Sequence, residues 1–159
     1  MTKDKSVHQG IRPGEVSVAA PEATDAGLVF IGRIRTPFAS RSDCPRQGDL
    51  DGPECTIELF APWDQGLAGI ERNEHLQVLY WLDQSRRDLV LQMPRGRTQP
   101  TGVFGLRSPV RPNPIGISIV RVVGREGATL IVRGLDCVDG TPLLDLKPQR
   151  CPAADAGGH

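Results

Sequence analysis

The chain of 159 residues lacks the features that mark several large classes of protein. No apolar run approaches the ~18 residues that a membrane-spanning helix needs, which excludes a helical membrane protein. The first residues lack the apolar core of a secretory signal peptide, so we expect a cytoplasmic protein. Neither the glycine-rich dinucleotide fingerprint nor the phosphate-binding Walker sequence occurs, so a Rossmann-type cofactor site has no support.

Cysteine and histidine are too few and too scattered to predict a metal site. The chain has four cysteines without a Cys-x-x-Cys pair, and its three histidines lie far apart. Structural zinc sites usually take their ligands from closely spaced pairs, so we expect no bound metal. In the cytoplasm the cysteines are expected to stay reduced thiols. They are Cys44, Cys55, Cys137 and Cys151.

The chain also lacks net charge, although its charges are unevenly distributed. Residues 86–111 contain six arginines and one acidic residue, Asp88, which gives this segment a charge of +5. Such a segment can form a basic surface that binds phosphates. Arginines that pair with acidic residues elsewhere would give the same composition, so both interpretations stay open.

Glycine and proline interrupt the chain often, with 18 and 14 residues, and no long amphipathic helix is visible. Short apolar or alternating runs predict strands, and residues 124–127 predict a hairpin turn. Residues 75–82 are almost wholly apolar and predict a central strand, while residues 67–71 predict one or two helical turns. The expected fold class is mostly β: a small single-domain antiparallel β-barrel with short helices and long ordered loops. The predicted strands are residues 28–35, 55–60, 75–82, 88–93, 116–123 and 129–134.

The distribution of these strands predicts the domain organisation. Residues 1–27 are polar and without periodicity, which is typical of a flexible N-terminal tail. Residues 28–150 contain the predicted strands and form the barrel domain. Residues 151–159 are then a short C-terminal tail.

Three polar segments rich in glycine and proline are candidates for chemistry. Pro45, Arg46 and Gln47 combine a stiff backbone with directional hydrogen-bonding groups, although a plain surface turn fits them as well. Residues 102–116 contain three prolines that hold the polar side chains between them, or form a structural crossover between strands. Residues 135–148 include the sequence Asp-Gly-Thr-Pro, which predicts a tight turn with free backbone amides and carbonyls.

Together, in order and spacing, these segments resemble the TsaA/YaeB-like (TrmO-type) tRNA methyltransferases over about residues 28–148. Two positions depart from that family's pattern: Glu74 replaces a small hydroxyl residue, and Gln149 replaces a tyrosine. The matching segments are residues 29–37, 45–47, 69–71, 75–76, 102–104, 107–108, 111–116 and 139–148.

The resemblance implies a small β-barrel that binds S-adenosyl-L-methionine (SAM) and works as a homodimer. It also implies methyl transfer to N6 of N6-threonylcarbamoyladenosine at position 37 of tRNA. It names no catalytic residue, although Asp139 and His75 are of a type that could accept a proton. The cofactor contacts that it implies are Pro45, Arg46, Gln47, Glu74, His75, Arg107, Ile117, Asp139, Gly140 and Thr141.

The arginine-rich segment completes this hypothesis, because phosphate contacts position an RNA. Trp63, which follows a proline in a turn, could stack on a base. The predicted RNA contacts are Arg86, Arg87, Arg95, Arg97 and Arg111. Two alternatives stay open: a SAM-dependent methyltransferase with a different substrate, and a non-catalytic barrel that binds RNA or another ligand.

Overall fold

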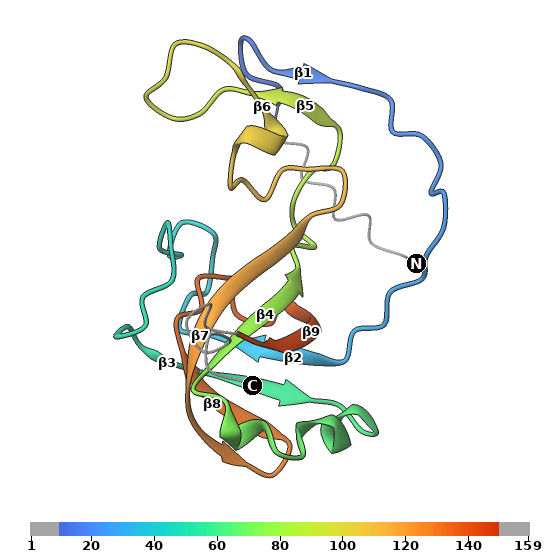
Figure 1. Cartoon of the computed structure of the whole chain (residues 1–159). Helices are drawn as coiled ribbons and strands as arrows, with labels where there is room; N and C mark the ends of the chain where they lie inside the picture. Colours follow the sequence, from blue (N-terminus) through green and yellow to red (C-terminus); the bar gives the residue numbers. More distant parts are fainter. Residues whose placement is uncertain (1–9, 150–159) are drawn as a thin grey trace, which may run out of the picture. The chain divides into compact units, whose positions relative to one another are not determined.

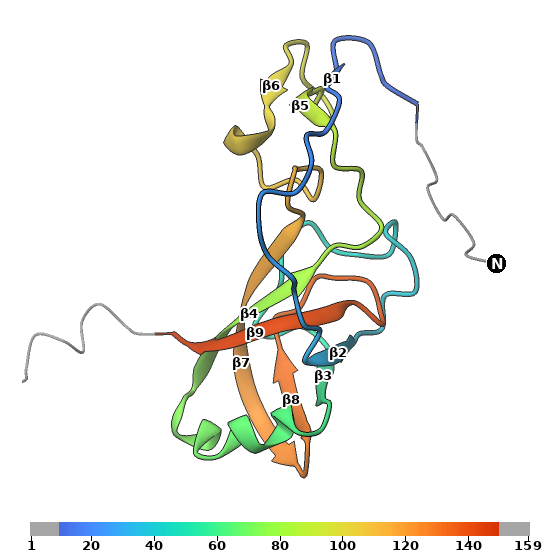
Figure 2. The same cartoon turned by 90° about the vertical axis from the view of Figure 1, so that its right-hand side faces the viewer.

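The computed structural model describes residues 10–149, and these residues divide into two compact units (Figures 1 and 2). The first unit consists of residues 10–27 and Leu82–Ile115, and the second of Leu28–Trp81 and residues 116–149. The predicted tail at residues 151–159, with Cys151, lies outside the described residues. No helix in residues 10–149 has the length and apolar character needed to cross a membrane.

The second unit is built around a closed barrel of six strands in the order β2-β3-β8-β7-β4-β9. Five pairs of neighbouring strands, β2–β3, β2–β9, β3–β8, β4–β9 and β7–β8, are antiparallel. The predicted fold class, a mostly β antiparallel barrel, is therefore confirmed. The strands are β2 (Gly32–Arg35), β3 (Glu54–Leu59), β4 (His75–Trp81), β7 (Ile115–Glu126), β8 (Thr129–Arg133) and β9 (Pro142–Pro148).

Alternation of side chains along the strands forms the barrel core. In β4, Leu76, Val78 and Tyr80 are buried, while the residues between them are partly exposed. Successive side chains of a strand point to opposite faces, so one set fills the barrel interior. The strand at 75–82 is central, with neighbours on both sides, but the structure shows that its outward side chains are not fully buried.

Three barrel strands differ from the sequence prediction. β7 continues to Glu126, so the hairpin turn begins later than the predicted residues 124–127. β2 begins at Gly32 rather than residue 28, and the preceding Leu28, Val29 and Phe30 are exposed. β9 was not predicted, because prolines at both of its ends and charged residues within it conceal the strand pattern. β9 pairs with both β2 and β4 and so closes the barrel.

Two short 3₁₀ helices, η1 (Trp63–Leu67) and η2 (Ile70–Arg72), connect β3 to β4. The predicted helical turns at 67–71 overlap both of them. Leu67 is buried and anchors this connection, and Arg125 donates a hydrogen bond of 3.1 Å to its carbonyl oxygen. The same guanidinium lies 3.1 Å from Glu71.

The first unit contains a three-stranded sheet in the order β1-β5-β6. Its core includes the buried residues Leu89, Val103 and Val110. β1 lies within the segment predicted to be a flexible tail, so part of that segment is ordered; a strand of two residues is too short to produce a hydropathy pattern. The elements are β1 (Val16–Ser17), β5 (Leu89–Gln92), β6 (Thr101–Gly102) and the 3₁₀ helix η3 (Val103–Gly105).

Candidate functional site

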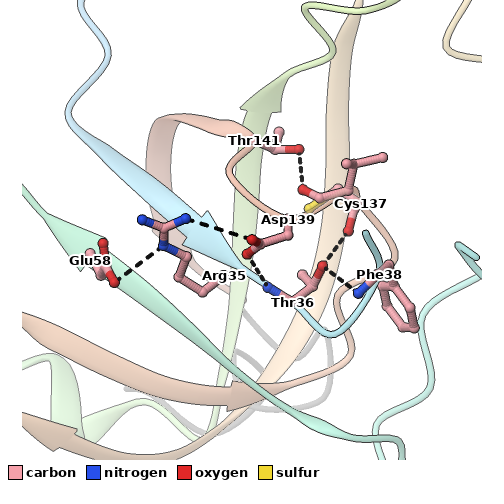
Figure 3. A network of polar contacts seen from close by, with 8 residues as sticks. Arg35, Thr36, Phe38, Glu58, Cys137, Asp139 and Thr141 are labelled. Atoms are coloured by element: carbon pink, nitrogen blue, oxygen red, sulfur yellow. Dashed lines mark hydrogen bonds and ion pairs between the residues drawn. The ribbon is translucent and has the colours of Figure 1, made fainter. Parts of the chain in front are cut away.

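The turn that precedes β9 is fixed to β2 by its acidic side chain (Figure 3). Asp139 Oδ1 accepts a hydrogen bond of 3.1 Å from the backbone N–H of Thr36, and Oδ2 lies 3.6 Å from Arg35 Nη1. Arg35 Nε also lies 3.4 Å from Glu58 Oε1. These three charged side chains are 41–42% exposed, so the ion pairs contribute little to stability. The main effect of the contacts with Thr36 and Arg35 is to orient the Asp139 carboxylate.

The backbone of this turn offers acceptors rather than donors. The N–H groups of Asp139 and Gly140 donate to the carbonyls of Phe38 and Ile34, both at 2.8 Å, and that of Thr141 donates within the turn. The prediction of free amides was therefore wrong, because β2 and the residues after it supply partners that the local sequence does not reveal. In the described part of the chain, the carbonyls of Asp139 and Gly140 accept no hydrogen bond.

Thr36 ties the same region together from the end of β2 (Figure 3). Its hydroxyl donates to the carbonyl of Cys137 at 2.8 Å and accepts from the backbone N–H of Phe38 at 3.3 Å. The Thr141 hydroxyl similarly donates to the Val138 carbonyl at 2.6 Å. Side-chain and backbone bonds thus hold residues 136–141 in one conformation.

The loop of Pro45, Arg46 and Gln47 is held against the segment that follows β8. A Cβ built on Gly48 would lie 1.8 Å from the carbonyl oxygen of Gly134, so only glycine permits this approach. All three predicted loop residues are exposed. The side chains of Arg46 and Gln47 have no partner among residues 10–149 and are available to a ligand.

The second unit also contains a buried polar cluster. The hydroxyls of Tyr80 and Ser118 lie 2.7 and 3.0 Å from Asp136 Oδ1, and 2.9 Å from each other. Burial and the Asp136 charge raise the pKa of Tyr80, so its hydroxyl remains protonated. Gly116 leaves room for the ring, because a Cβ there would meet the ring carbons of Tyr80 at 2.2 and 2.7 Å.

No member of this cluster could be found from the sequence motifs. Tyr80, Ser118 and Asp136 are absent from the residues predicted to contact the cofactor or the RNA. A usable signal was the inward position of Ser118, since a polar side chain on the buried face of a strand needs a hydrogen-bond partner.

Burial disfavours the thiolate form of three cysteines in the barrel unit. Burial raises the pKa of Cys137 to about 12. Burial and the charge of Asp136 also raise the pKa of the half-buried Cys44. Cys44, Cys55 and Cys137 carry no disulfide. Since the thiolate is the reactive form, a raised pKa lowers the reactivity of these thiols near neutral pH.

Glu74 and His75 lie at the other end of β4 from the Asp139 turn. In the β4–β9 register, Tyr80 faces Leu143, whereas the His75 carbonyl accepts from Gln149. Five residues of strand separate the two ends, which is roughly 17 Å. One chain therefore does not bring this predicted pair together with residues 139–141.

The last two predicted cofactor residues lie on different units. Ile117 is exposed on β7, next to the inward Ser118, and belongs to the barrel unit. Arg107 is exposed and belongs to the first unit. The assignment of both residues to a cofactor stays a prediction.

All five predicted RNA contacts lie in the first unit, where they divide into two groups. Arg86 pairs with Asp88 at 2.7 Å, and Arg87 donates to the Pro112 carbonyl at 2.6 Å. Arg111 donates to the carbonyls of residues 106 and 108 at 3.0 and 2.8 Å. Arg87 and Arg111 thus support the proline-rich loop, whereas Arg86 is paired next to β5.

Arg95 and Arg97 form the second group. They flank Gly96, whose φ of 76° makes a turn, and both are exposed. Within the described chain, neither guanidinium has an ion-pair or hydrogen-bond partner. These two arginines are accordingly the more available RNA contacts, although RNA binding by any of the five stays a prediction.

Comparison with known proteins gives a consistent result. The family model of the tRNA-methyltransferase O N-terminal domain matches residues 33–156. "Probable S-adenosyl-L-methionine-binding protein VirR" of Rhizobium radiobacter is 56% identical over 140 residues, which cover 88% of this chain and 80% of VirR. An S-adenosyl-L-methionine-binding protein of Archaeoglobus fulgidus is 43% identical over 117 residues, covering 74% of this chain and 84% of that protein.

A solved structure supports the same relationship. The crystal structure of TrmO from Pseudomonas aeruginosa is 38% identical and matches with a TM-score of 0.66. The match covers 85% of this chain and 60% of the TrmO chain. The chain thus spans about three fifths of the length of that solved relative.

Proposed function

The chain belongs to the family of the tRNA-methyltransferase O N-terminal domain, and on that premise we propose that it is a SAM-dependent tRNA methyltransferase. Its proposed substrate is N6-threonylcarbamoyladenosine at position 37 of tRNA, methylated at N6 in the cytoplasm. The observation that carries the proposal is the pairing of complementary groups in the barrel unit. Arg46 and Gln47 are available on one loop of this unit, and the carbonyls of Asp139 and Gly140 are available on the turn before β9.

These groups fit the chemistry of the cofactor. The carboxylate of SAM matches the guanidinium of Arg46, which forms strong charge-assisted hydrogen bonds. The amino group and ribose hydroxyls of its adenosine are donors and match the acceptor carbonyls of Asp139 and Gly140. When bound, SAM supplies an electrophilic methyl group on its sulfonium.

The residues of the chain itself contribute by positioning the cofactor and the substrate. Methyl transfer is an in-line displacement, so alignment of the reacting atoms supplies much of the acceleration. The bonds of Thr36 and Arg35 to Asp139 fix the turn, and the close approach of Gly48 to Gly134 fixes the loop. Both binding segments are therefore preorganised, which lowers the entropy cost of binding.

We also propose that the protein acts as a homodimer. Glu74 and His75 lie roughly 17 Å of strand away from the Asp139 turn, so a second copy could supply them to the same site. The outward face of β7 exposes Ile117, Ile119 and Val123 at 41–45%, and exposed apolar groups on one strand favour association. Sedimentation equilibrium tests this proposal. We expect the mass of a dimer, and the mass of a monomer would contradict the proposal.

Labelled methyl transfer tests the enzymatic proposal directly. The purified chain is incubated with methyl-labelled SAM and tRNA that either carries or lacks the threonylcarbamoyl group. Label on the modified tRNA alone supports the proposed substrate, whereas label on unmodified tRNA alone contradicts it. Calorimetry with SAM accompanies the assay, because saturable binding without transfer to tRNA indicates another substrate. RNA binding without SAM binding indicates a non-catalytic barrel.

A further inference from the structure

The strongest unassigned feature of the barrel unit is the carboxylate of Asp136. One of its oxygens, Oδ1, lies within hydrogen-bond distance of two hydroxyls, Tyr80 at 2.7 Å and Ser118 at 3.0 Å. Tyr80 is 4% exposed and Ser118 is 7% exposed, so both donors are fixed by packing. Two buried donors on one oxygen hold the carboxylate in a single orientation.

The second carboxylate oxygen is left available. No residue between 10 and 149 hydrogen-bonds or ion-pairs with Asp136 Oδ2. Asp136 is only partly buried, unlike Tyr80 and Ser118. A polar group held rigidly by one atom, with a second atom free to accept, is the arrangement that a preorganised acceptor requires.

Asp136 also lies close in the chain, or through its hydrogen-bond partner, to the segments proposed to bind the cofactor. It precedes the Asp139 turn by three residues, and Ser118 follows Ile117 directly. Gly134, two residues before Asp136, is the backbone that Gly48 approaches at the end of the loop of Pro45. The carboxylate therefore lies where the loop, the turn and β7 converge.

On this geometry we propose that Asp136 Oδ2 accepts the proton that leaves N6 during methyl transfer. The inference rests on the proposed function. The N6 lone pair forms the new bond to the methyl carbon, and the electron pair of the carbon–sulfur bond leaves with the sulfur. The electrons of the N–H bond remain on N6, and its proton passes to Asp136 and then to water. Atoms and charges balance without a further reactant.

The other candidates near the turn are engaged or protonated. Asp139 uses Oδ1 for the Thr36 backbone and Oδ2 for Arg35. Cys137, with its pKa raised to about 12 by burial, is a thiol at neutral pH. His75 lies at the far end of β4. Asp136 is the group that combines a fixed position with a free acceptor.

The test is Asp136→Asn, which keeps the shape and an oxygen that accepts from both hydroxyls but cannot take a proton. We expect single-turnover methyl transfer to modified tRNA to fall by ~10²–10⁴-fold, the range for loss of general-base catalysis. The SAM dissociation constant from calorimetry and the melting temperature should stay at their wild-type values. Asp51→Asn, at a side chain that is 93% exposed, is the matched control.

Tyr80→Phe separates positioning from proton transfer. It removes one donor to Asp136 Oδ1 and leaves the acceptor in place, so the transfer rate should fall less than in Asp136→Asn. An equal or larger loss in Tyr80→Phe, with SAM affinity intact, would show that the hydroxyl rather than the carboxylate is essential and would overturn the inference.

The remaining outcomes are distinct from failure of the proposed function. If wild type methylates modified tRNA and Asp136→Asn does so at a similar rate, the inference falls and the function stands. If Asp136→Asn loses SAM binding, Asp136 is a cofactor contact and the inference also falls. If wild type binds SAM but transfers no methyl group to tRNA, both the proposed function and the inference that rests on it are wrong.

Discussion

Gly48→Ala is the sharpest test of how the barrel unit holds its loop. The added Cβ would lie 1.8 Å from the carbonyl oxygen of Gly134 and 2.7 Å from its carbonyl carbon. A carbon–oxygen contact needs roughly 3.3 Å, so the two backbones must separate by about 1.5 Å. Neither partner is a flexible side chain, and Gly134 is itself held at a φ of 117°.

The size of the loss in stability depends on whether the loop or the backbone at Gly134 moves. Pro45, Arg46 and Gln47 are exposed, whereas Gly134 directly follows β8 in the barrel, so the loop should shift. Overpacking costs ~1–3 kcal/mol, and a yielding loop places the cost near the lower end. A loss of about 1 kcal/mol lowers the melting temperature by ~2–4 °C in a protein of this size. A displaced Arg46 would lose its charge-assisted hydrogen bond to the SAM carboxylate, about 1.5–3 kcal/mol, so SAM affinity should fall at least ~10-fold.

The assay combines calorimetry with SAM and thermal melting of the apo-protein. Gly66→Ala is the matched control, because a Cβ at that exposed position meets nothing within 4 Å. The reasoning predicts a large loss of affinity with a small loss of stability in Gly48→Ala alone. Wild-type SAM affinity in Gly48→Ala would show that the position of this loop does not determine cofactor binding.

Two further predictions concern the buried thiol and the arginines. Burial raises the pKa of Cys137 from 9.0 to about 12, so the folded state holds this proton more tightly than the unfolded state. The free energy of unfolding therefore has its full value below pH 9 and decreases as the pH rises towards 12. Urea unfolding at pH 8 to 11 should show a shallower loss of stability in Cys137→Ala than in wild type, and parallel curves would contradict this cause. Arg97→Ala should weaken tRNA binding and reduce its salt slope by about one, whereas Arg107→Ala should weaken SAM binding. The reverse pattern, measured by tRNA titration and calorimetry, would show that these roles are exchanged.

Much of the barrel could be predicted from the sequence, because most of its strands alternate between apolar and polar residues. β9 could not, since Pro142 and Pro148 mark its ends as loop-like. The pairing with β2 and β4 that makes it a strand comes from residues far away in the chain. A local hydropathy pattern predicts the strands that alternate between apolar and polar residues. It does not predict a strand that forms only because distant strands pair with it.

The same limit applies to the site. The loop at 45–47 and the turn at 139–141 were found through a resemblance in short motifs. The Tyr80–Ser118–Asp136 cluster joins residues 18, 38 and 56 positions apart, and no local motif contains two of them. The amides of the turn were expected to be free, although their partners include Phe38 and Ile34, about a hundred residues earlier.

Closure of the barrel restricts how a partner can attach. Every strand of the ring β2-β3-β8-β7-β4-β9 has a neighbour on both sides, so the described part of this unit offers no open edge to an added strand. In the other unit the sheet edges, β1 and β6, are two residues long each and too short to template pairing. Any partner of the described residues would therefore contact side chains and loops rather than extend a sheet. The sequence of these side chains and loops can change without altering the backbone hydrogen bonds of the barrel. The binding specificity can therefore vary while the fold stays the same.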